Sequence, residues 1–113
     1  QLEPKLDAAS LGALRERLDT VQASAALVDY LQALLSASRR HARIRVGLSP
    51  RAGLALLRAA RAWAMLEDRH HCLPEDVQAV FAAVAAHRLV PSADAGLDRD
   101  ALARQILDTV PVD

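Results

Sequence analysis

The sequence predicts an all-α fold, a small helical bundle of about four to five helices with no substantial sheet. Hydrophobic residues make up 52% of the chain, and alanine and leucine supply most of them. Such a composition suits closely packed helices. Aromatic residues amount to only 3%, fewer than a β-sandwich usually needs. Leucine and valine also recur every three or four positions, as on one face of a helix.

Two helices are predicted in the N-terminal part. Asp7 can cap a first helix that runs to about residue 18. A short break follows at residues 20–23, and Ser24 can cap a second helix that runs to about Ser38. Basic residues then favour a helix C-terminus. The apolar faces consist of Leu11, Leu14 and Leu18 in the first helix and Leu27, Val28, Leu31, Leu34 and Leu35 in the second.

A third helix follows a connector, Ile44 to Leu48, that we expect to be extended at most. Within the stretch GLSPRAG, Ser49 can cap the helix and Pro50 suits its first position. The helix should run to about Glu67. Its segment LALLRAARAWAML is apolar on more than one side, so we expect this helix to be central and buried against several neighbours.

The remaining elements are a polar loop at residues 68–72, a fourth helix opened by Pro74, a linker at residues 91–97 and a closing helix at 98–110 capped by Asp98. We expect residues 1–113 to form a single domain with its core at about residues 21–90. The predicted inward residues are Val77, Val80, Phe81 and Val84 in the fourth helix and Leu102, Ile106 and Leu107 in the last.

Charge and cysteine content exclude several classes of protein. Basic and acidic residues number 14 each, so no global positive field points to nucleic acid or an anionic membrane. Cys72 is the single cysteine and cannot form an internal disulfide. No apolar run of about 18 residues and no secretory leader is visible, so we expect no membrane span and a cytoplasmic location. The start at Gln1 predicts a piece of a longer protein.

Metal binding and nucleophilic catalysis are not favoured. His70, His71 and Cys72 are consecutive, whereas structural zinc sites use spaced pairs of ligands. Cys72 beside a histidine could be an activated thiol, but its position just before a helix favours packing. The acids Glu75 and Asp76 are explained by the helix dipole. The chain contains no GK[ST] phosphate loop, so we expect no metal site and no self-sufficient catalytic site.

Arg51 is the residue that calls for an explanation. It lies in the first turn of the third helix, where the dipole disfavours a cation by roughly 0.3–1 kcal/mol. One interpretation is an exposed arginine whose small cost is tolerated. The other is that the helix start and the guanidinium together bind an anion, most naturally a phosphate. The residues alone leave both interpretations open.

A resemblance favours the second interpretation. The order GLSPRAGLALLRAARAWAMLEDR, then HHCLPEDVQAVFAAVAAHRLV, resembles the C-terminal lid of MoxR-type AAA+ ATPases. Magnesium-chelatase-like lids are more distant relatives. The upstream VQASAALVDYLQALLSASR and the ending ARQILDTVPV extend the similarity to most of the chain.

The resemblance implies that Arg51 is the sensor 2 residue, reaching the γ-phosphate of ATP from the lid. Backbone at Leu48, Ser49 and Pro50 would help to line the nucleotide pocket. The Walker motifs, sensor 1 and arginine finger would lie upstream, so the fragment alone is not an enzyme, whereas the parent protein would hydrolyse ATP with Mg²⁺.

The resemblance also implies partners. The parent protein would assemble into a ring, which we expect to be a hexamer, and would act as a chaperone-like remodeller, with von Willebrand A domain proteins as possible partners. Arg58, Arg61 and Arg88 are candidates for contacts with a neighbouring subunit. Two departures from the family stand out: Leu73 replaces a capping threonine or serine, a loss of about 0.5–2 kcal/mol, and Asp68 replaces a common glycine.

Two other functions remain open. A free-standing helical adaptor would bind proteins and never contact nucleotide, and it would have no phosphate loop upstream. A helical DNA-binding module would show a steep salt dependence of duplex binding, which the neutral charge disfavours.

Overall fold

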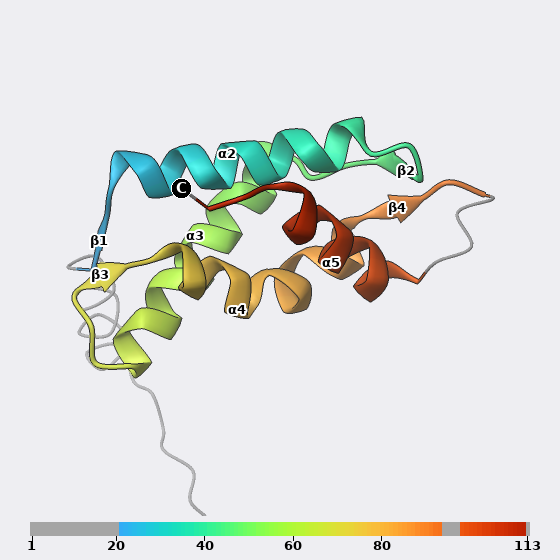
Figure 1. Ribbon diagram of the computed structural model, residues 1–113. Helices are drawn as coiled ribbons and strands as arrows, with labels where there is room; N and C mark the ends of the chain where they lie inside the picture. Colours follow the sequence, from blue (N-terminus) through green and yellow to red (C-terminus); the bar gives the residue numbers. More distant parts are fainter. Residues whose placement is uncertain (1–20, 94–97, 113) are drawn as a thin grey trace, which may run out of the picture.

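In the described part of the chain four α-helices form the bundle, which confirms the predicted all-α class. The computed structural model describes residues 21–93 and 98–112. The helix predicted at residues 7–18 lies outside this part of the chain. In Figure 1 the helices are α2 (Ala25–Arg40), α3 (Pro50–Leu66), α4 (Pro74–Ala85), followed by the 3₁₀ turn η1 (Ala86–Arg88), and α5 (Arg99–Thr109).

Two short ladders hold the ends of the bundle (Figure 1). Strand β1 (Gln22–Ala23) pairs in parallel with β3 (His71–Cys72), in the register Gln22 to His71 and Ala23 to Cys72. At the opposite end, β2 (Ile44–Val46) pairs antiparallel with β4 (Val90–Pro91), with an irregularity between Ile44 and Val46. The connector before α3 is therefore extended. The loop at residues 68–72 and the linker at 91–97 each contribute strand residues that sequence inspection did not predict.

The predicted caps at three helix starts are confirmed. The Ser24 Oγ accepts a hydrogen bond from the N–H of Leu27 at 3.1 Å. The Asp98 Oδ1 accepts one from the N–H of Ala101 at 2.7 Å. The Ser49 Oγ does the same for α3, as described below. Each bond satisfies an amide that the helix itself leaves unpaired.

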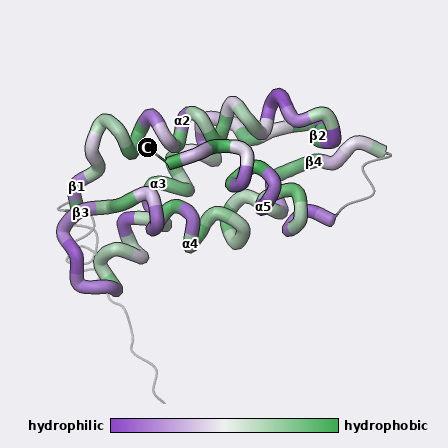
Figure 2. Tube along the Cα trace, in the orientation of Figure 1, coloured by the Kyte–Doolittle hydropathy of each residue, from purple (hydrophilic) through white to green (hydrophobic). Residues whose placement is uncertain are grey.

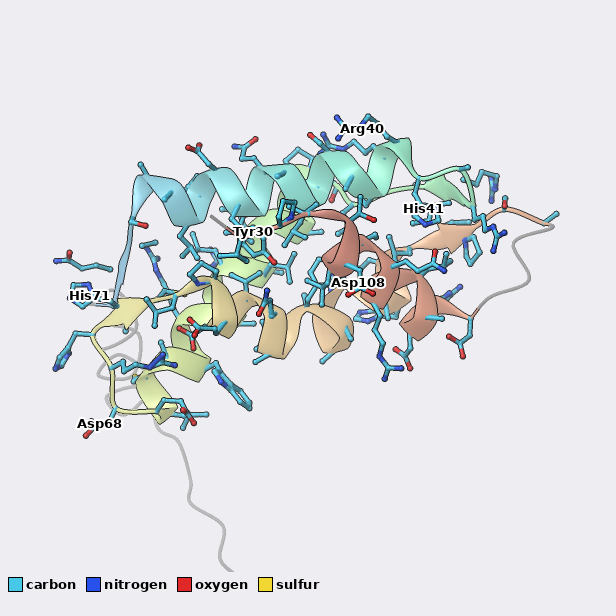
Figure 3. All side chains as sticks on the ribbon, viewed as in Figure 1. Tyr30, Arg40, His41, Asp68, His71 and Asp108 are labelled. Atoms are coloured by element: carbon cyan, nitrogen blue, oxygen red, sulfur yellow. The ribbon has the colours of Figure 1, made fainter. Side chains whose placement is uncertain are left out.

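The core lies where α4 meets α3 and α5. On α3 the buried residues are spaced by four positions and are mostly alanine, so α4 can approach closely. Polar contacts join α2 to the other helices: the Gln78 Nε2 donates to the Tyr30 hydroxyl at 3.3 Å, and Figure 3 shows Tyr30 pointing inward from α2. The largest fully buried apolar side chains are Phe81, Leu27, Leu34, Leu48, Leu56, Leu89, Leu102, Ile106, Val21 and Val77.

His41 ties the end of α2 to α5. Its Nδ1 accepts a hydrogen bond from the N–H of Arg43 at 3.0 Å, and its Nε2 lies 2.9 Å from the Gln105 Oε1. Because an amide oxygen only accepts, the Nε2 must carry the hydrogen. Figure 3 labels this histidine beside α5.

The expectation that α3 is central and packs against several neighbours is correct, because it contacts α4, α2 and β3, but several of its apolar side chains remain exposed. Leu54 is 56% exposed, Trp63 42% and Leu66 78%. The helix packs against α4 along one stripe and meets α2 beside Gly53, whereas Leu54, Trp63 and Leu66 lie outside these contacts. Figure 2 shows hydrophilic segments at the loop between α3 and β3 and at the end of α2.

None of the helices within residues 21–93 and 98–112 is long and apolar enough to cross a membrane.

Candidate functional site

Leu48, the residue just before the cap of α3, is hydrogen-bonded to the last turn of α2. The fully buried Ser38 accepts a hydrogen bond from the N–H of Leu48 on its Oγ at 2.8 Å and donates to the carbonyl of Leu35 at 2.7 Å. The Arg39 Nε donates to the carbonyl of Leu48 at 3.0 Å. Both backbone polar groups of Leu48 are therefore held by α2.

Gly47 is where the connector passes closest to α2. A Cβ atom at this position would lie 2.8 Å from the Cα and N of Arg39 and from the carbonyl carbon of Ser38. These are backbone atoms and cannot move aside as a side chain can. The close approach therefore requires glycine.

The first turn of α3 leaves few donors for a ligand. The Ser49 Oγ accepts from the N–H of Ala52 at 3.2 Å, and the N–H of Gly53 donates to the carbonyl of Ser49 at 3.1 Å. Pro50 has no N–H. Within the described part of the chain, the amide of Arg51 has no hydrogen-bond partner, and its exposed side chain forms no ion pair. An arriving anion would thus meet one amide and one guanidinium, fewer donors than a helix start can offer.

A groove of about 470 Å³ lies between α2 and α3, beside this helix start. Arg39 and Pro50 line it from the adjoining ends of the two helices. Its apolar walls come from Val28, Leu31, Leu35, Leu54 and Leu57. Of the predicted residues Leu48, Ser49, Pro50 and Arg51, Pro50 lines this groove, Leu48 is buried, and Ser49 and Arg51 are exposed beside it at the corner where α3 begins.

Cys72 is a packed residue with an unreactive environment. Its side chain is 4% exposed. Burial raises the pKa of its thiol to about 11, and the negative charge of Asp76 adds to this, while Arg61 and Arg69 oppose it. The neighbouring His70 and His71 are exposed, and within residues 21–93 and 98–112 no cluster of metal-ligating side chains is found.

Cys72 should therefore resist alkylation in the folded chain. A pKa raised from 9.0 to about 11 lowers the thiolate fraction at pH 8 about a hundredfold, and the thiolate is the reacting species. Iodoacetamide labelling followed by mass spectrometry should show fast modification only in denaturant. Rapid labelling of native protein at pH 8 would contradict the buried placement.

Asp76 was missed by the sequence analysis, which explained it by the helix dipole alone. Its side chain is 1% exposed. The Oδ2 accepts from the N–H of Leu73 at 2.7 Å, and the Oδ1 pairs with the guanidinium of Arg69. Leu73 has no capping oxygen, so Asp76 at the third helical position restores half of a capping box. The pattern of an acid three residues after the cap position could have indicated this.

The second departure from the family, Asp68 in place of a common glycine, is explained by its backbone conformation. Asp68 has φ 62°, in the left-handed region where glycine is favoured and aspartate is tolerated better than most residues. Figure 3 shows Asp68 at the outer end of the loop after α3.

The three arginines considered for subunit contacts lie on two elements. Arg58 is exposed and Arg61 is partly buried, both on α3, and the Nε of Arg61 has no hydrogen-bond partner in the described part of the molecule. Arg88 is exposed at the end of η1 and donates to the carbonyl of Val84.

Comparison with known proteins identifies one matching family and several similar proteins. The model of the AAA lid domain family matches residues 36–109. The uncharacterized protein YeaC of Bacillus subtilis is 29% identical over 98% of this chain and 36% of its own length. Protein MoxR of Paracoccus denitrificans is 48% identical over 61% of this chain and 22% of its own, and chaperone MoxR1 of Mycobacterium tuberculosis is 34% identical over 75% and 26%.

A crystal structure of a protein from Cytophaga hutchinsonii, described as a candidate ATPase, superposes with a TM-score of 0.86 at 27% identity. The match covers 93% of this chain and 36% of that one. The chain thus spans about a third or less of the length of these proteins. It belongs to the AAA lid domain family, as a lid of the MoxR type.

Proposed function

We propose that this lid closes over ATP in a longer MoxR-type AAA+ ATPase and supplies Arg51 as sensor 2 to the γ-phosphate. The observation that supports this most is the placement of Arg51. It is an exposed cation without an ion-pair partner in the described residues, at the helix end whose dipole is positive. Only an anion arriving from outside turns that position from mildly unfavourable to favourable.

The corner fits a phosphate group better than a metal ion. The guanidinium and amide of Arg51 are both donors, and the positive helix end adds to their attraction for an anion. The resemblance implies that the ligands of Mg²⁺ would belong to the Walker motifs of the upstream core. Bound ATP would supply the phosphoryl group whose hydrolysis drives remodelling.

Leu48, Ser49 and Pro50 would shape the wall of the pocket rather than donate to the nucleotide. Both backbone polar groups of Leu48 are engaged by α2, and the Ser49 Oγ caps Ala52. Pro50 has no N–H. Arg51 is therefore the residue of this corner that can respond to the γ-phosphate. Gaining or losing its charge-assisted contact would distinguish ATP from ADP and change the lid angle.

The whole protein would form a ring, which we expect to be a hexamer in the cytoplasm, and act as a chaperone-like remodeller together with von Willebrand A domain proteins. Arg58, Arg61 and Arg88 remain candidates for contacts with the neighbouring subunit. Arg58 and Arg61 share α3 with the exposed Leu54, which favours α3 over η1 for such a contact.

Replacing Arg51 by alanine in the full-length protein tests the proposal. Steady-state ATP turnover should fall about tenfold to a hundredfold while ATP affinity changes only a few-fold, because the lost contact matters most in the transition state. Arg51→Lys should recover part of the turnover, since it keeps the charge but not the bidentate geometry. Arg104→Ala removes an exposed arginine from α5 and is the matched control.

Turnover unchanged in Arg51→Ala would make Arg51 an ordinary surface arginine. A wild-type protein without ATPase activity and without an upstream phosphate loop would favour the helical adaptor instead.

A further inference from the structure

We propose that Arg39 is a positioning residue for Arg51. The proposal rests on the function proposed above and starts from the double hold on Leu48, whose N–H is bound by Ser38 and whose carbonyl is bound by Arg39. Ser49 and Pro50 alone separate this residue from Arg51. The Ser49 side chain is committed to the cap, and the ring of Pro50 fixes its φ. The backbone that aims Arg51 is therefore determined largely by where α2 holds Leu48.

The two holding residues contribute differently. Ser38 is fully buried, so its hydroxyl is part of the fold, and removing it would leave buried groups unpaired. Arg39 is exposed and its bond to the Leu48 carbonyl is only partly buried, so we expect its removal to cost less stability than removal of the buried Ser38 hydroxyl. What water cannot replace is the fixed direction of that carbonyl relative to α2. Arg39 thus affects orientation more than stability.

The environment of Arg39 supports this assignment. Its Nε donates to a backbone carbonyl, and it has no carboxylate partner among the described residues. It lines the groove together with Pro50, at the corner that contains Arg51. Arg40, the next residue, is also exposed, but it lines a different pocket together with residues of α5 and is not hydrogen-bonded to the connector.

The experiment compares the full-length wild type with Arg39→Ala, Arg40→Ala, Arg51→Ala and the double variant Arg39→Ala/Arg51→Ala. We expect Arg39→Ala to lower kcat about threefold to tenfold with little change in ATP affinity, as a misaimed group does. In the Arg51→Ala background the same change should have no further effect, because residues that act through one another are not additive. Arg40→Ala should match wild type, and Arg39→Lys should recover part of kcat.

A second measurement needs no turnover. Amide hydrogen exchange in the nucleotide-free protein should be faster over residues 48–53 in Arg39→Ala and unchanged in α4 and α5, because only the hold on the connector is lost. Arg40→Ala should leave exchange over residues 48–53 as in wild type.

The outcomes separate the two proposals. If Arg51→Ala slows turnover and Arg39→Ala does not, or slows it by the same factor in both backgrounds, the role of Arg39 is overturned and the sensor 2 proposal stands. Unchanged exchange over residues 48–53 also overturns it. If Arg51→Ala leaves turnover unchanged, both proposals fail.

Discussion

Replacement of Gly47 by alanine is expected to destabilise the 113-residue chain by about 3 kcal/mol. The new Cβ would lie 2.8 Å from backbone atoms of Ser38 and Arg39, so the connector must move away from α2. That movement stretches the bond from the Leu48 N–H to the buried Ser38 hydroxyl and leaves both groups poorly paired. Denaturant unfolding followed by circular dichroism would measure the loss.

Gly53 provides the matched control. A Cβ there would also approach a neighbour to 2.8 Å, but that neighbour is the Cδ1 of Leu35, the end of a flexible side chain. Alanine is favoured over glycine inside a helix by about 1 kcal/mol, which offsets the repacking. Gly53→Ala should therefore be nearly neutral. If Gly47→Ala and Gly53→Ala lowered the free energy of unfolding equally, contact with backbone atoms would not be the cause of the loss at Gly47.

Replacement of Asp76 by alanine should have a similar effect, also about 3 kcal/mol. The change removes the acceptor of the Leu73 N–H and leaves the guanidinium of Arg69 without its carboxylate. The Arg69 side chain is 33% exposed, so water can solvate it in part, which keeps the expected loss at the lower end of values for buried pairs.

Two variants separate the contributions of Asp76. Asp76→Asn keeps an acceptor for Leu73 but removes the charge, so its loss should be about half as large. Glu75→Ala removes an exposed acid from the same helix turn and should lose less than about 1 kcal/mol, the value of a dipole contact. Urea unfolding of the three variants measures these differences. An Asp76→Ala loss no greater than that of Glu75→Ala would contradict the capping role.

The parts of the fold that depend on residues close in sequence could be predicted, whereas those that depend on distant segments could not. Ser24, Ser49 and Asp98 begin their helices as expected, because a cap depends on residues within one turn. The two ladders could not be predicted, because each strand is two or three residues long and pairs with a segment far along the chain. Strands this short have no periodic pattern to detect.

The candidate site was predictable in part, for the same reason. Ser49 and Arg51 are visible in GLSPRAG, and the resemblance supplied a role for the arginine that stays a prediction. The hold of Arg39 on Leu48 was not visible, because a backbone carbonyl accepts bonds whatever its residue type. Gly47 opens the same stretch, but its sequence neighbours do not explain why glycine is needed there, whereas the packing against α2 does.

The two ladders also have a consequence for how the lid moves. They interleave along the sequence: β2 lies inside the loop that β1 and β3 close, and β3 lies inside the loop that β2 and β4 close. A cut anywhere between β1 and β4 therefore separates the two strands of at least one ladder. We therefore expect this domain to unfold in a single cooperative transition. In its folded state we expect the bundle to move as a rigid body, so that a displacement at the corner of Arg51 also displaces the opposite end of the bundle.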